Sequence, residues 1–432
     1  MVSSLDPPRV ASGDVVVEDG RVRAVGAAPA GGVRRDCSGC LIVPGQVCGH
    51  THLYSSLARG MPYRLAPPAD FLQILQRVWW RLDRALDEEM IRASALAGGA
   101  AALLAGTTTL IDHHASPNAI DGSLDIVAEA LEGLGLRSVL CYEVSDRDGP
   151  QRASAGLAEN RRFLARRRAL TRGLFGAHAS FTLSAETLAA CVEGARAAGV
   201  GLHIHVAEDP VDRRDALARF GMPPVARLAA AGALTADALL AHCIHLDEHE
   251  MSLLVTSGAT VAHNPTSNMN NAVGHTPLRR LGERVVIGTD GIGGDMWREV
   301  QTAYFRAREE DVFLPITWPL ARAAQAARLA GRIFAEPLLG TIAPGAPADL
   351  VVLDYPAPTP LVQDNLAGHW VFGFHAACVR DVLVAGDVVV ENRKLVRADA
   401  ARLAAETAEQ ARRLWERLEA VGVHPFTPAG GA

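Results

Sequence analysis

The sequence predicts an α/β fold: a (β/α)8 TIM barrel with a small β-sandwich domain built from both termini of the chain. Short apolar runs alternate with Ala/Leu/Arg-rich helical patterns through the middle of the chain, as expected of repeated βα units. Val-rich runs of another style stand near the two ends, GDVVVED at 13–19 and GDVVVEN at 386–392. One barrel with a small appendage also accounts for a length of 432 residues without a linker.

Eight apolar runs have the length of barrel strands and are separated by helical patterns such as SAETLAACVEGARAAG at 184–199. Most of them begin with apolar residues and end with His, Asp, Glu, Asn or Ser. Since the carboxyl ends of the strands form the active-site face of such barrels, this placement predicts a functional site there. The predicted strands are residues 41–47, 106–114, 137–144, 173–180, 201–208, 238–245, 259–268 and 284–291.

The two ends of the chain are predicted to build the sandwich together. Asp19-Gly20 is a strong hairpin-turn signal between two Val-rich runs. The apolar runs at 348–354 and 379–396 repeat this style. We therefore predict three segments: residues 1–43 as the N-terminal part of the sandwich, 44–340 as the barrel, and 341–432 as the C-terminal part of the sandwich plus a terminal helix.

The composition is that of a globular protein that handles small molecules. Hydrophobic residues make up 49% of the chain, charged residues 21%, and the formal net charge is −6, which argues against nucleic-acid and membrane partners. The start of the sequence has no basic region followed by an apolar core, so a cytoplasmic location is the simplest expectation. Seven scattered cysteines argue against a disulfide framework. The single CxxC, Cys37 and Cys40, is weak evidence for a metal site.

Two histidines one residue apart, His50 and His52, follow the first predicted strand in PGQVCGHTH. Residues i and i+2 of a strand face the same side, so both imidazoles can reach one ion. A single HxH pair is common by chance. Its interpretation therefore depends on what stands at the ends of the later strands.

Three later strand ends supply matching side chains. His205 lies near the end of the fifth run with Glu208 three residues on, His242 near the end of the sixth, and Asp290 near the end of the eighth. Three neutral imidazole nitrogens and one carboxylate suit a borderline divalent ion such as Zn²⁺, with a position left for water. The pattern predicts a metal site at the mouth of the barrel.

The ordered motifs HTH, HVAE, AHC, HNPTSN and GTDG resemble the amidohydrolase superfamily over about residues 13 to 396. They are most similar to its mononuclear deaminase and chlorohydrolase (ATZ/TRZ-like) branch, which includes guanine, cytosine and S-adenosylhomocysteine deaminases and triazine hydrolases. Within that branch, HTHLYSSLARGM, FLQILQRVWWRLDRAL, CYEVSDRDG and HNPTSNMNNAVG look most like SsnA-type aminohydrolases. Because dimers are usual among such relatives, the resemblance implies a homodimer.

The resemblance also implies roles for single residues. Glu208 matches the proton shuttle, and His242 matches the histidine that polarises substrate or positions water. Two-metal members bridge their ions with a carboxylated barrel lysine, whereas the only lysine of this sequence, Lys394, lies in the C-terminal hairpin pattern. One divalent ion is therefore expected, Zn²⁺ or alternatively Fe²⁺. The residues that match its ligands are His50, His52, His205 and Asp290.

The implied reaction is hydrolytic deamination of an amidine- or guanidine-like carbon in a nitrogen heterocycle of the purine, pterin, pyrimidine or triazine type. A bound divalent ion lowers the pKa of its water to roughly 7, so that metal-bound hydroxide can attack this carbon. Asp290 would orient the attack, Glu208 would pass a proton to the departing ammonia, and His242 would steady the tetrahedral centre. Two alternatives stay open: hydrolysis of an amide, formimino or carbon–halogen bond at the same site, and a non-catalytic binding or assembly barrel.

Other side chains near strand ends are weaker candidates for substrate contacts, since each could equally make a structural hydrogen bond or ion pair. Trp79 and Trp80 lie in a long insert whose helical spacing favours core packing, with a lid over the site as the alternative. His203 is expected to be a hydrogen-bonded histidine one layer lower in the barrel, and Cys48 a buried thiol. The substrate-contact candidates are Arg59, His113, Glu143, His178, His263 and Asn268.

Overall fold

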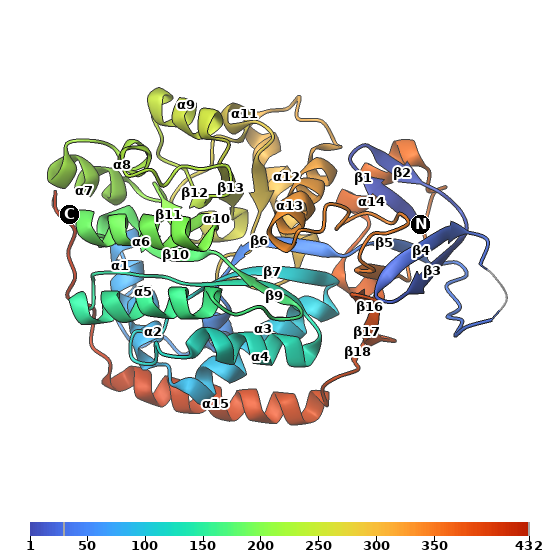
Figure 1. Ribbon diagram of the computed structural model, residues 1–432, viewed down its shortest axis with the longest axis horizontal. Coiled ribbons are helices and arrows are strands. Elements are labelled where there is room, and N and C mark those ends of the chain that lie inside the picture. The colour runs from blue at the N-terminus through green and yellow to red at the C-terminus, as the bar shows by residue number, and fades with distance from the viewer. Residues whose placement is uncertain (29–30, 431–432) are drawn as a thin grey trace.

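A closed barrel of parallel strands forms the centre of the computed structural model, which describes residues 1–28 and 31–430 (Figure 1). The strands pair in two ladders, β6 to β9 and β10 to β14. Parallel bridges from Thr51 to Asp290 and from Val144 to Ala177 close the ring. The strands are β6 (Gln46–Thr51), β7 (Thr107–His114), β8 (Arg137–Tyr142), β9 (Thr171–Gly173), β10 (Phe175–Ala179), β11 (Leu202–Val206), β12 (Leu239–His242), β13 (Thr260–His263) and β14 (Val285–Ile287).

Helices cover the outside of the barrel, as the predicted βα units require (Figure 1). The helix predicted at 184–199 begins after Ser184, whose side chain accepts from the Thr187 N–H, and ends at Gly199 with a φ of 66°. Among the described residues, no helix is both long enough and apolar enough to cross a membrane. The barrel helices are α3 (Glu88–Leu104), α4 (Ser123–Leu134), α5 (Pro150–Leu164), α6 (Ala185–Ala198), α7 (Pro210–Phe220), α8 (Pro224–Ala230), α9 (Glu248–Ser257), α10 (Pro265–Asn270), α11 (Leu278–Leu281), α12 (Met296–Glu310) and α13 (Trp318–Phe334).

The first predicted strand, 41–47, is wrong in one respect, because the run is divided between two sheets. Leu41–Pro44 forms β5 of the terminal sheet, and the first barrel strand begins at Gln46. The change falls at Gly45, where a Cβ would lie 2.1 Å from Thr108 Oγ1. Only glycine fits so close to β7, so the chain leaves one sheet and enters the other at this point.

The seventh predicted strand, 259–268, is also wrong in its second half. The strand β13 ends at His263, and Pro265 opens the helix α10. Proline suits the first turn of a helix but cannot donate to a sheet, which explains the early end. Asn268 therefore projects from a helix rather than from a strand.

Both ends of the chain contribute to one small sheet domain, as predicted. Its main sheet is antiparallel with the order β18-β17-β16-β15-β5. The predicted turn at Asp19-Gly20, with φ of 49° and 76°, joins β3 to β4. Residues 29–30 and 431–432, inside the predicted segments 1–43 and 341–432, lie outside the described residues. The elements are β1 (Val2–Leu5), β2 (Pro8–Val10), β3 (Asp14–Glu18), β4 (Arg21–Gly26), β5 (Leu41–Pro44), β15 (Leu350–Leu353), α14 (Leu366–Phe372), β16 (Val379–Val384), β17 (Asp387–Glu391) and β18 (Lys394–Leu395).

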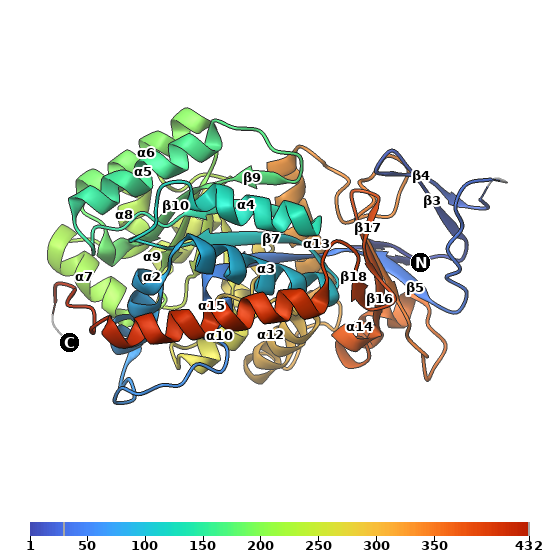
Figure 2. The ribbon, with the colours of Figure 1, turned by 90° about the horizontal axis from the view of Figure 1, so that it is seen from below.

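Two further segments build the rim of the barrel mouth. α15 (Ala400–Ala420) runs from the sheet domain along the outside of the barrel beside α3 (Figure 2). The chain that follows α15 returns to the mouth, where Gln76 Nε2 donates to the Phe426 carbonyl at 2.8 Å. Gln76 belongs to the insert after β6, so the C-terminal end packs against that insert. The insert comprises η1 (Leu53–Ala58), α1 (Phe71–Ile74), the π-helical turn η2 (Leu75–Trp79) and α2 (Trp80–Ala85).

One buried ion pair fastens the sheet domain to the barrel. Arg137, at the start of β8, donates to Asp349, just before β15, through Nε–Oδ2 at 2.9 Å and Nη2–Oδ1 at 3.1 Å. The two side chains are 6% and 2% exposed. The N–H of Ala385 also donates to Asp349 Oδ1, at 2.7 Å. Such a bidentate pair is strong, and the loss of one partner would leave a charge buried alone.

We expect Asp349→Ala to lower the free energy of unfolding by about 3–5 kcal/mol, because it leaves the Arg137 charge buried without a partner. Urea denaturation followed by circular dichroism measures this change. The control is Arg21→Ala, which breaks the partly exposed pair of Arg21 and Glu336 and should cost less than about 1 kcal/mol. An equal loss of stability in the two variants would contradict the fastening role of the buried pair.

Candidate active site

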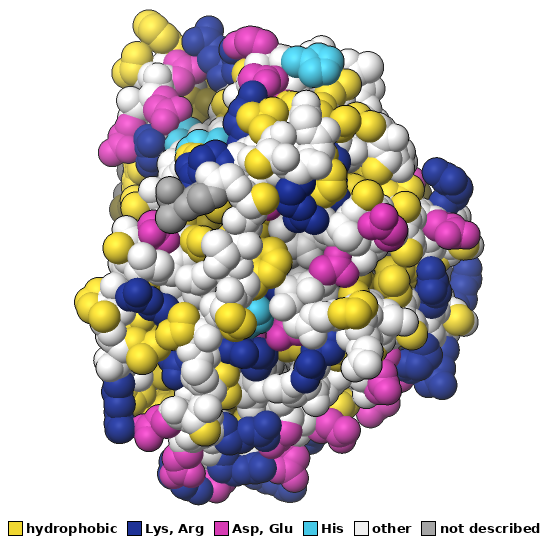
Figure 3. All heavy atoms as spheres, turned by 90° about the vertical axis from the view of Figure 1, so that its left-hand side faces the viewer, with side chains coloured by type: hydrophobic (Ala, Val, Ile, Leu, Met, Phe, Trp, Pro, Cys, Tyr) yellow, Lys and Arg dark blue, Asp and Glu magenta, His cyan; other side chains and the backbone are white. Residues whose placement is uncertain are grey.

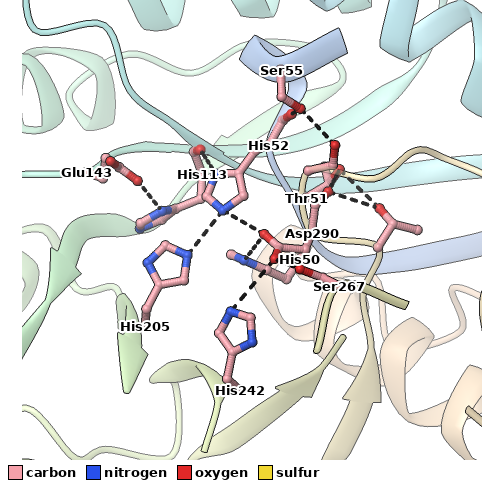
Figure 4. A network of polar contacts seen from close by, with 12 residues as sticks. His50, Thr51, His52, Ser55, His113, Glu143, His205, His242, Ser267 and Asp290 are labelled. Atoms are coloured by element: carbon pink, nitrogen blue, oxygen red, sulfur yellow. Dashed lines mark hydrogen bonds and ion pairs between the residues drawn. The ribbon is translucent and has the colours of Figure 1, made fainter. Parts of the chain in front are cut away.

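Four side chains that could ligate a metal ion meet at the carboxyl ends of the barrel strands. His50 lies on β6 and His52 directly follows it, His205 lies on β11, and Asp290 follows β14. One ligand atom of each lies within 4.8 Å of the ligand atoms of the other three. The sequence predicted these residues as one group, and the structure brings them together (Figure 4).

The distances inside this group are those of a site that needs a cation. His52 Nε2 lies 3.1 Å from His205 Nε2 and 3.0 Å from Asp290 Oδ1. His50 Nε2 lies 3.5 Å from the same Asp290 oxygen. All four side chains are buried. Two imidazole lone pairs repel each other at 3.1 Å, so a proton or a metal ion belongs between them, and a divalent ion satisfies all four groups at once.

Hydrogen bonds on the far side of each ring fix which nitrogen faces the group. Nδ1 of His52 and Nδ1 of His205 each donate to a backbone carbonyl, at 2.6 Å and 2.7 Å. Nδ1 of His50 lies 2.9 Å from Nε2 of His203. In all three rings the δ nitrogen is therefore occupied as a donor, and the ε nitrogen is free for an ion.

His203 supports His50 from below, where the sequence suggested a hydrogen-bonded histidine. Burial, together with the neighbouring histidines His113 and His50, lowers the pKa of His203 well below its ordinary value, so the ring is neutral. Its Nδ1 lies 3.4 Å from Cys141 Sγ. A neutral ring that donates from Nδ1 accepts at Nε2, so His203 accepts the Nδ1–H of His50.

Glu208 and His242 stand beside the four ligand candidates. Nδ1 of His242 donates to Asn268 Oδ1 at 2.8 Å. Nε2 of His242 then faces Glu208 Oε2 at 3.4 Å and Asp290 Oδ2 at 4.0 Å. Burial and the nearby Asp290 raise the pKa of Glu208 well above its ordinary value, and burial lowers the pKa of His242. A carboxyl group able to hold a proton therefore faces a neutral imidazole.

Non-glycine residues with positive φ turn the chain at these strand ends. The φ angle is 49° at Ala207, 73° at His242 and 52° at Asp290. Such backbone costs about 1–3 kcal/mol per residue and persists where surrounding contacts hold it. At Asp290 the contact is the N–H bond to the His50 carbonyl, at 3.1 Å. The side chains of His242 and Asp290 line the pocket from these turns.

A pocket opens in front of this group. Figure 3 looks onto the face at which the barrel strands end, with histidine and acidic side chains visible at the bottom of a hollow. Aromatic and aliphatic side chains line part of the wall, which suits a flat ring. The apolar wall consists of Tyr54, Phe71, Leu75, Trp79, Trp80 and Phe181, and the polar residues include His52, Glu143, Arg147, His178, Glu208, His242, Asn271 and Asp290.

The family model described as the amidohydrolase family matches residues 41–389 of the chain. The chain belongs to the amidohydrolase family. It is 32% identical over 430 residues to the 5-methylthioadenosine/S-adenosylhomocysteine deaminase of Desulforudis audaxviator, covering 94% of this chain and 96% of the relative. It is 33% identical over 385 residues to the 5′-deoxyadenosine deaminase of Methanopyrus kandleri, covering 87% and 86%.

Solved structures agree with this assignment. The crystal structure of an adenosine deaminase from Xanthomonas campestris, with bound zinc, has a TM-score of 0.80 and 26% identity, and the match covers 93% of both chains. The predicted amidohydrolase superfamily, barrel fold and hydrolase class are thereby confirmed. The roles of single residues in this amidohydrolase are inferred from the geometry of its site.

Three of the six predicted substrate contacts line a cavity. Glu143, directly after β8, and His178, on β10, line the pocket in front of the ligand candidates. Arg59 is exposed and lies in a second cleft, which Trp79 separates from the first pocket by lining both. The first two side chains therefore remain in reach of a substrate at the metal group.

The other three predicted contacts lie behind the pocket wall. Each is paired with another polar side chain: His113 Nδ1 with Glu143 Oε2 at 3.1 Å, Asn268 with His242 at 2.8 Å, and His263 with Thr276 at 3.0 Å. Through these hydrogen bonds, the three residues orient the side chains with which they pair. Asn268 in particular decides which nitrogen of His242 faces the pocket.

Sequence reasoning missed four polar residues of the pocket: Arg147, Asp209, Asp212 and Asn271. Arg147 is 2% exposed and pairs with Asp83, with Asp148 at 3.1 Å, and with Glu143 at 3.5 Å. Asp83 lies 64 positions away in the sequence. No local pattern reveals such a pair, although Arg147 stands four residues after a predicted site residue.

Glu143 is a carboxylate in this environment. Burial raises its pKa, but His178, His113 and Arg147 lower it by more, so that the pKa lies well below its ordinary range. Its side chain is only 2% exposed. An anion with fixed cationic and hydrogen-bonding neighbours thus lines the pocket.

Cys48 is a buried thiol, as expected. Its Sγ lies 3.3 Å from Thr289 Oγ1, and burial raises its pKa to about 11.

Trp79 and Trp80 belong to the pocket wall, and Trp80 is 1% exposed with its ring 5.9 Å from that of His178. Core packing and contact with the pocket are therefore combined in Trp80.

We expect His203→Ala to weaken metal binding by about 10- to 100-fold, because it deprives His50 of the acceptor that orients it while all four ligand candidates remain. Competition with a chromophoric chelator measures the affinity. The control is His263→Ala, which removes another buried histidine that bonds to Thr276 and should change the affinity by less than about 3-fold. Equal weakening in both variants would mean that His203 acts only through general stability.

Proposed function

We propose that this amidohydrolase is a deaminase that hydrolyses an amidine-like carbon of a purine-type heterocycle. The observation that carries the proposal is the position of Glu208 and His242, 3.4 Å apart, beside the four ligand candidates at the pocket. Hydrolytic removal of an amine needs activated water, a proton carrier and a group that holds the attacking oxygen. These three requirements are met by neighbouring side chains.

One Zn²⁺ ion is the best occupant of the four-residue group. The buried Nε2 of His50 has no hydrogen-bond partner among the described residues, and three imidazoles with one carboxylate are a common zinc donor set. The X. campestris relative holds zinc. The only lysine, Lys394, lies on β18 in the sheet domain, which supports a single ion. When bound, the ion supplies activation of water at neutral pH. The ligands are His50, His52, His205 and Asp290.

Glu208 moves the protons in the proposed reaction. Its carboxylate takes a proton from the water, and its raised pKa lets it hold that proton until the leaving amine accepts it. His242 positions the water. Because Nδ1 of His242 donates to Asn268, its Nε2 presents a lone pair that accepts an O–H bond.

The substrate class draws support from the relatives and from the pocket wall. The curated relatives described above are named as deaminases of adenine nucleosides, and adenine is a cyclic amidine. Trp79, Trp80 and Phe181 provide broad apolar surface for a ring of that kind. The finer resemblance to SsnA-type aminohydrolases remains a prediction within this proposal.

Metal-replete protein should release ammonia from at least one member of a panel of aminopurines, pterins, aminopyrimidines, triazines and guanidines. Glu208→Gln should lower kcat by about 10²- to 10⁴-fold, because it removes the proton carrier, while the metal content stays unchanged. Ammonia production coupled to glutamate dehydrogenase measures the activity on the panel and the kcat of the variant. Release of halide or a new carboxylate in place of ammonia would favour the alternative bonds, and an unchanged kcat would remove Glu208 from the mechanism.

Plasma mass spectrometry should find about one zinc ion per chain, the stoichiometry of a mononuclear site. His50→Ala and Asp290→Ala should each lose this ion because each removes a ligand. His245→Ala is the control, since this nearby ring bonds to the Val273 carbonyl at 2.7 Å and lies outside the group. Retention of zinc in Asp290→Ala would contradict the ligand assignment, and two ions per chain would contradict the single site.

A further inference from the structure

We propose that Glu143 selects the substrate by accepting hydrogen bonds from ring N–H groups of an unsubstituted heterocyclic base. The inference rests on the proposed function and narrows its substrate class. The substrate is then a free amino- or oxo-substituted base, whose ring nitrogens carry hydrogen, rather than a nucleoside, whose glycosidic nitrogen carries none. Four observations on the pocket lead to this conclusion.

First, Glu143 is close to the reacting centre. One of its carboxylate oxygens lies within 4.8 Å of a ring nitrogen of His205 and of a ring nitrogen of His178. His205 is a proposed ligand of the ion that activates the water. A carboxylate so near a proposed ligand histidine is within reach of the ring of a heterocycle bound at the ion.

Second, the carboxylate keeps acceptor capacity for a ligand. Oε2 of Glu143 accepts from His113 Nδ1 at 3.1 Å, and Oε1 has one long contact, with Arg147 Nη1 at 3.5 Å. A carboxylate accepts about four hydrogen bonds. The lone pairs that these two contacts leave unused are on the Glu143 carboxylate, which lines the pocket.

Third, three of the five N–H donors of Arg147 are directed at carboxylates of the protein. Its Nη2 is bonded to Asp83, its Nε donates to Asp148 Oδ2 at 3.1 Å, and its guanidinium carbon lies 5.4 Å from the Trp80 ring centroid. The guanidinium is held by these contacts, and its Nη1 in turn holds Glu143 in place. The Glu143 carboxylate is the acceptor on this side of the pocket, and a ligand group that meets it must bring the hydrogen.

Fourth, aromatic rings line the same pocket as Glu143. Trp80 and Phe181 belong to the lining of this pocket, and the Trp80 ring packs on His178 with centroids 5.9 Å apart. A base that brings no N–H to Glu143 would leave the remaining acceptor lone pairs of this carboxylate buried without a partner. Sites built on such hydrogen bonds discriminate strongly against analogues that lack the donor.

The experiment compares each base with its N-methyl analogue, which differs only in the ring N–H. Adenine and 9-methyladenine, and guanine and 9-methylguanine, are titrated calorimetrically into zinc-loaded Glu208→Gln protein, so that turnover does not consume the probe. We expect each unsubstituted base to bind about 10- to 100-fold more tightly than its methyl analogue, the value of a hydrogen bond to a charged group. Glu143→Gln in the same background should reduce this preference to less than about 3-fold.

Two further variants separate selectivity from folding. Asp148→Asn weakens the same Arg147 network without changing the acceptor, and it should keep the preference for the unsubstituted base. Glu143→Asp retains the charge beside Arg147 but withdraws the carboxylate by one methylene, so it should lose the preference even if Glu143→Gln fails to fold. Thermal melting and zinc content are recorded for every variant.

Three results would overturn the inference. The first is tighter binding of 5′-deoxyadenosine than of adenine, lost with Glu143→Gln, which would place the carboxylate on the sugar hydroxyls. The second is equal preference for the free base with and without Glu143. The third is loss of zinc in Glu143→Gln, which would make Glu143 a ligand. Because binding is measured without turnover, failure of the deaminase proposal appears separately, as free-base binding without ammonia release in the wild type.

Discussion

Closure of the barrel between β6 and β14 is the constraint on which the site depends. The N–H groups of Thr289 and Asp290 both donate to the His50 carbonyl, at 2.9 Å and 3.1 Å, and the His52 N–H donates to the Asp290 carbonyl at 3.3 Å. The bonds that join the first strand to the last therefore run between the proposed ligands themselves. A Cβ at Gly288 would lie 2.7 Å from the His50 carbonyl oxygen, so glycine permits this approach. Ligand geometry and barrel closure cannot vary independently.

The pocket has a buried carboxylate on each of two sides, Asp290 and Glu143, and different groups neutralise the two charges. Although burial opposes it, the imidazoles of His50 and His52 beside the carboxylate hold the pKa of Asp290 well below its ordinary range. Buried anions require a cationic partner. Glu143 has a permanent partner in Arg147, which is itself tied into ion pairs. The charged partners of Asp290 among the described residues are titratable rings, those of His50, His52 and His242, and Ser267 adds a hydroxyl donor. The proposed metal ion would supply the permanent positive charge on this side of the pocket.

The barrel and the proposed ligands could be predicted because both leave local signals in the sequence. His50 and His52 stand at a spacing that only a strand end makes useful, and Glu208 follows His205 at a fixed interval. Arg147 left no such signal, because its partner Asp83 comes from the insert and meets it only in the folded chain. The positive φ angles at the strand ends were equally hidden, since non-glycine residues adopt them under tertiary constraint.

The C-terminal tail connects the sheet domain to the pocket by a route that the sequence did not reveal. After α15 has run along the barrel, Nε2 of His424 lies 3.3 Å from Asp148 Oδ1, and its ring lies 5.1 Å from that of Trp80. Asp148 in turn pairs with Arg147, which holds the carboxylate of Glu143. The acceptor that we assign to substrate selection is thus supported through a chain of contacts that ends in the tail. The sheet domain lies at the far end of the barrel, but the chain that continues from it through α15 and the tail contributes to the shape of the pocket (Figure 1).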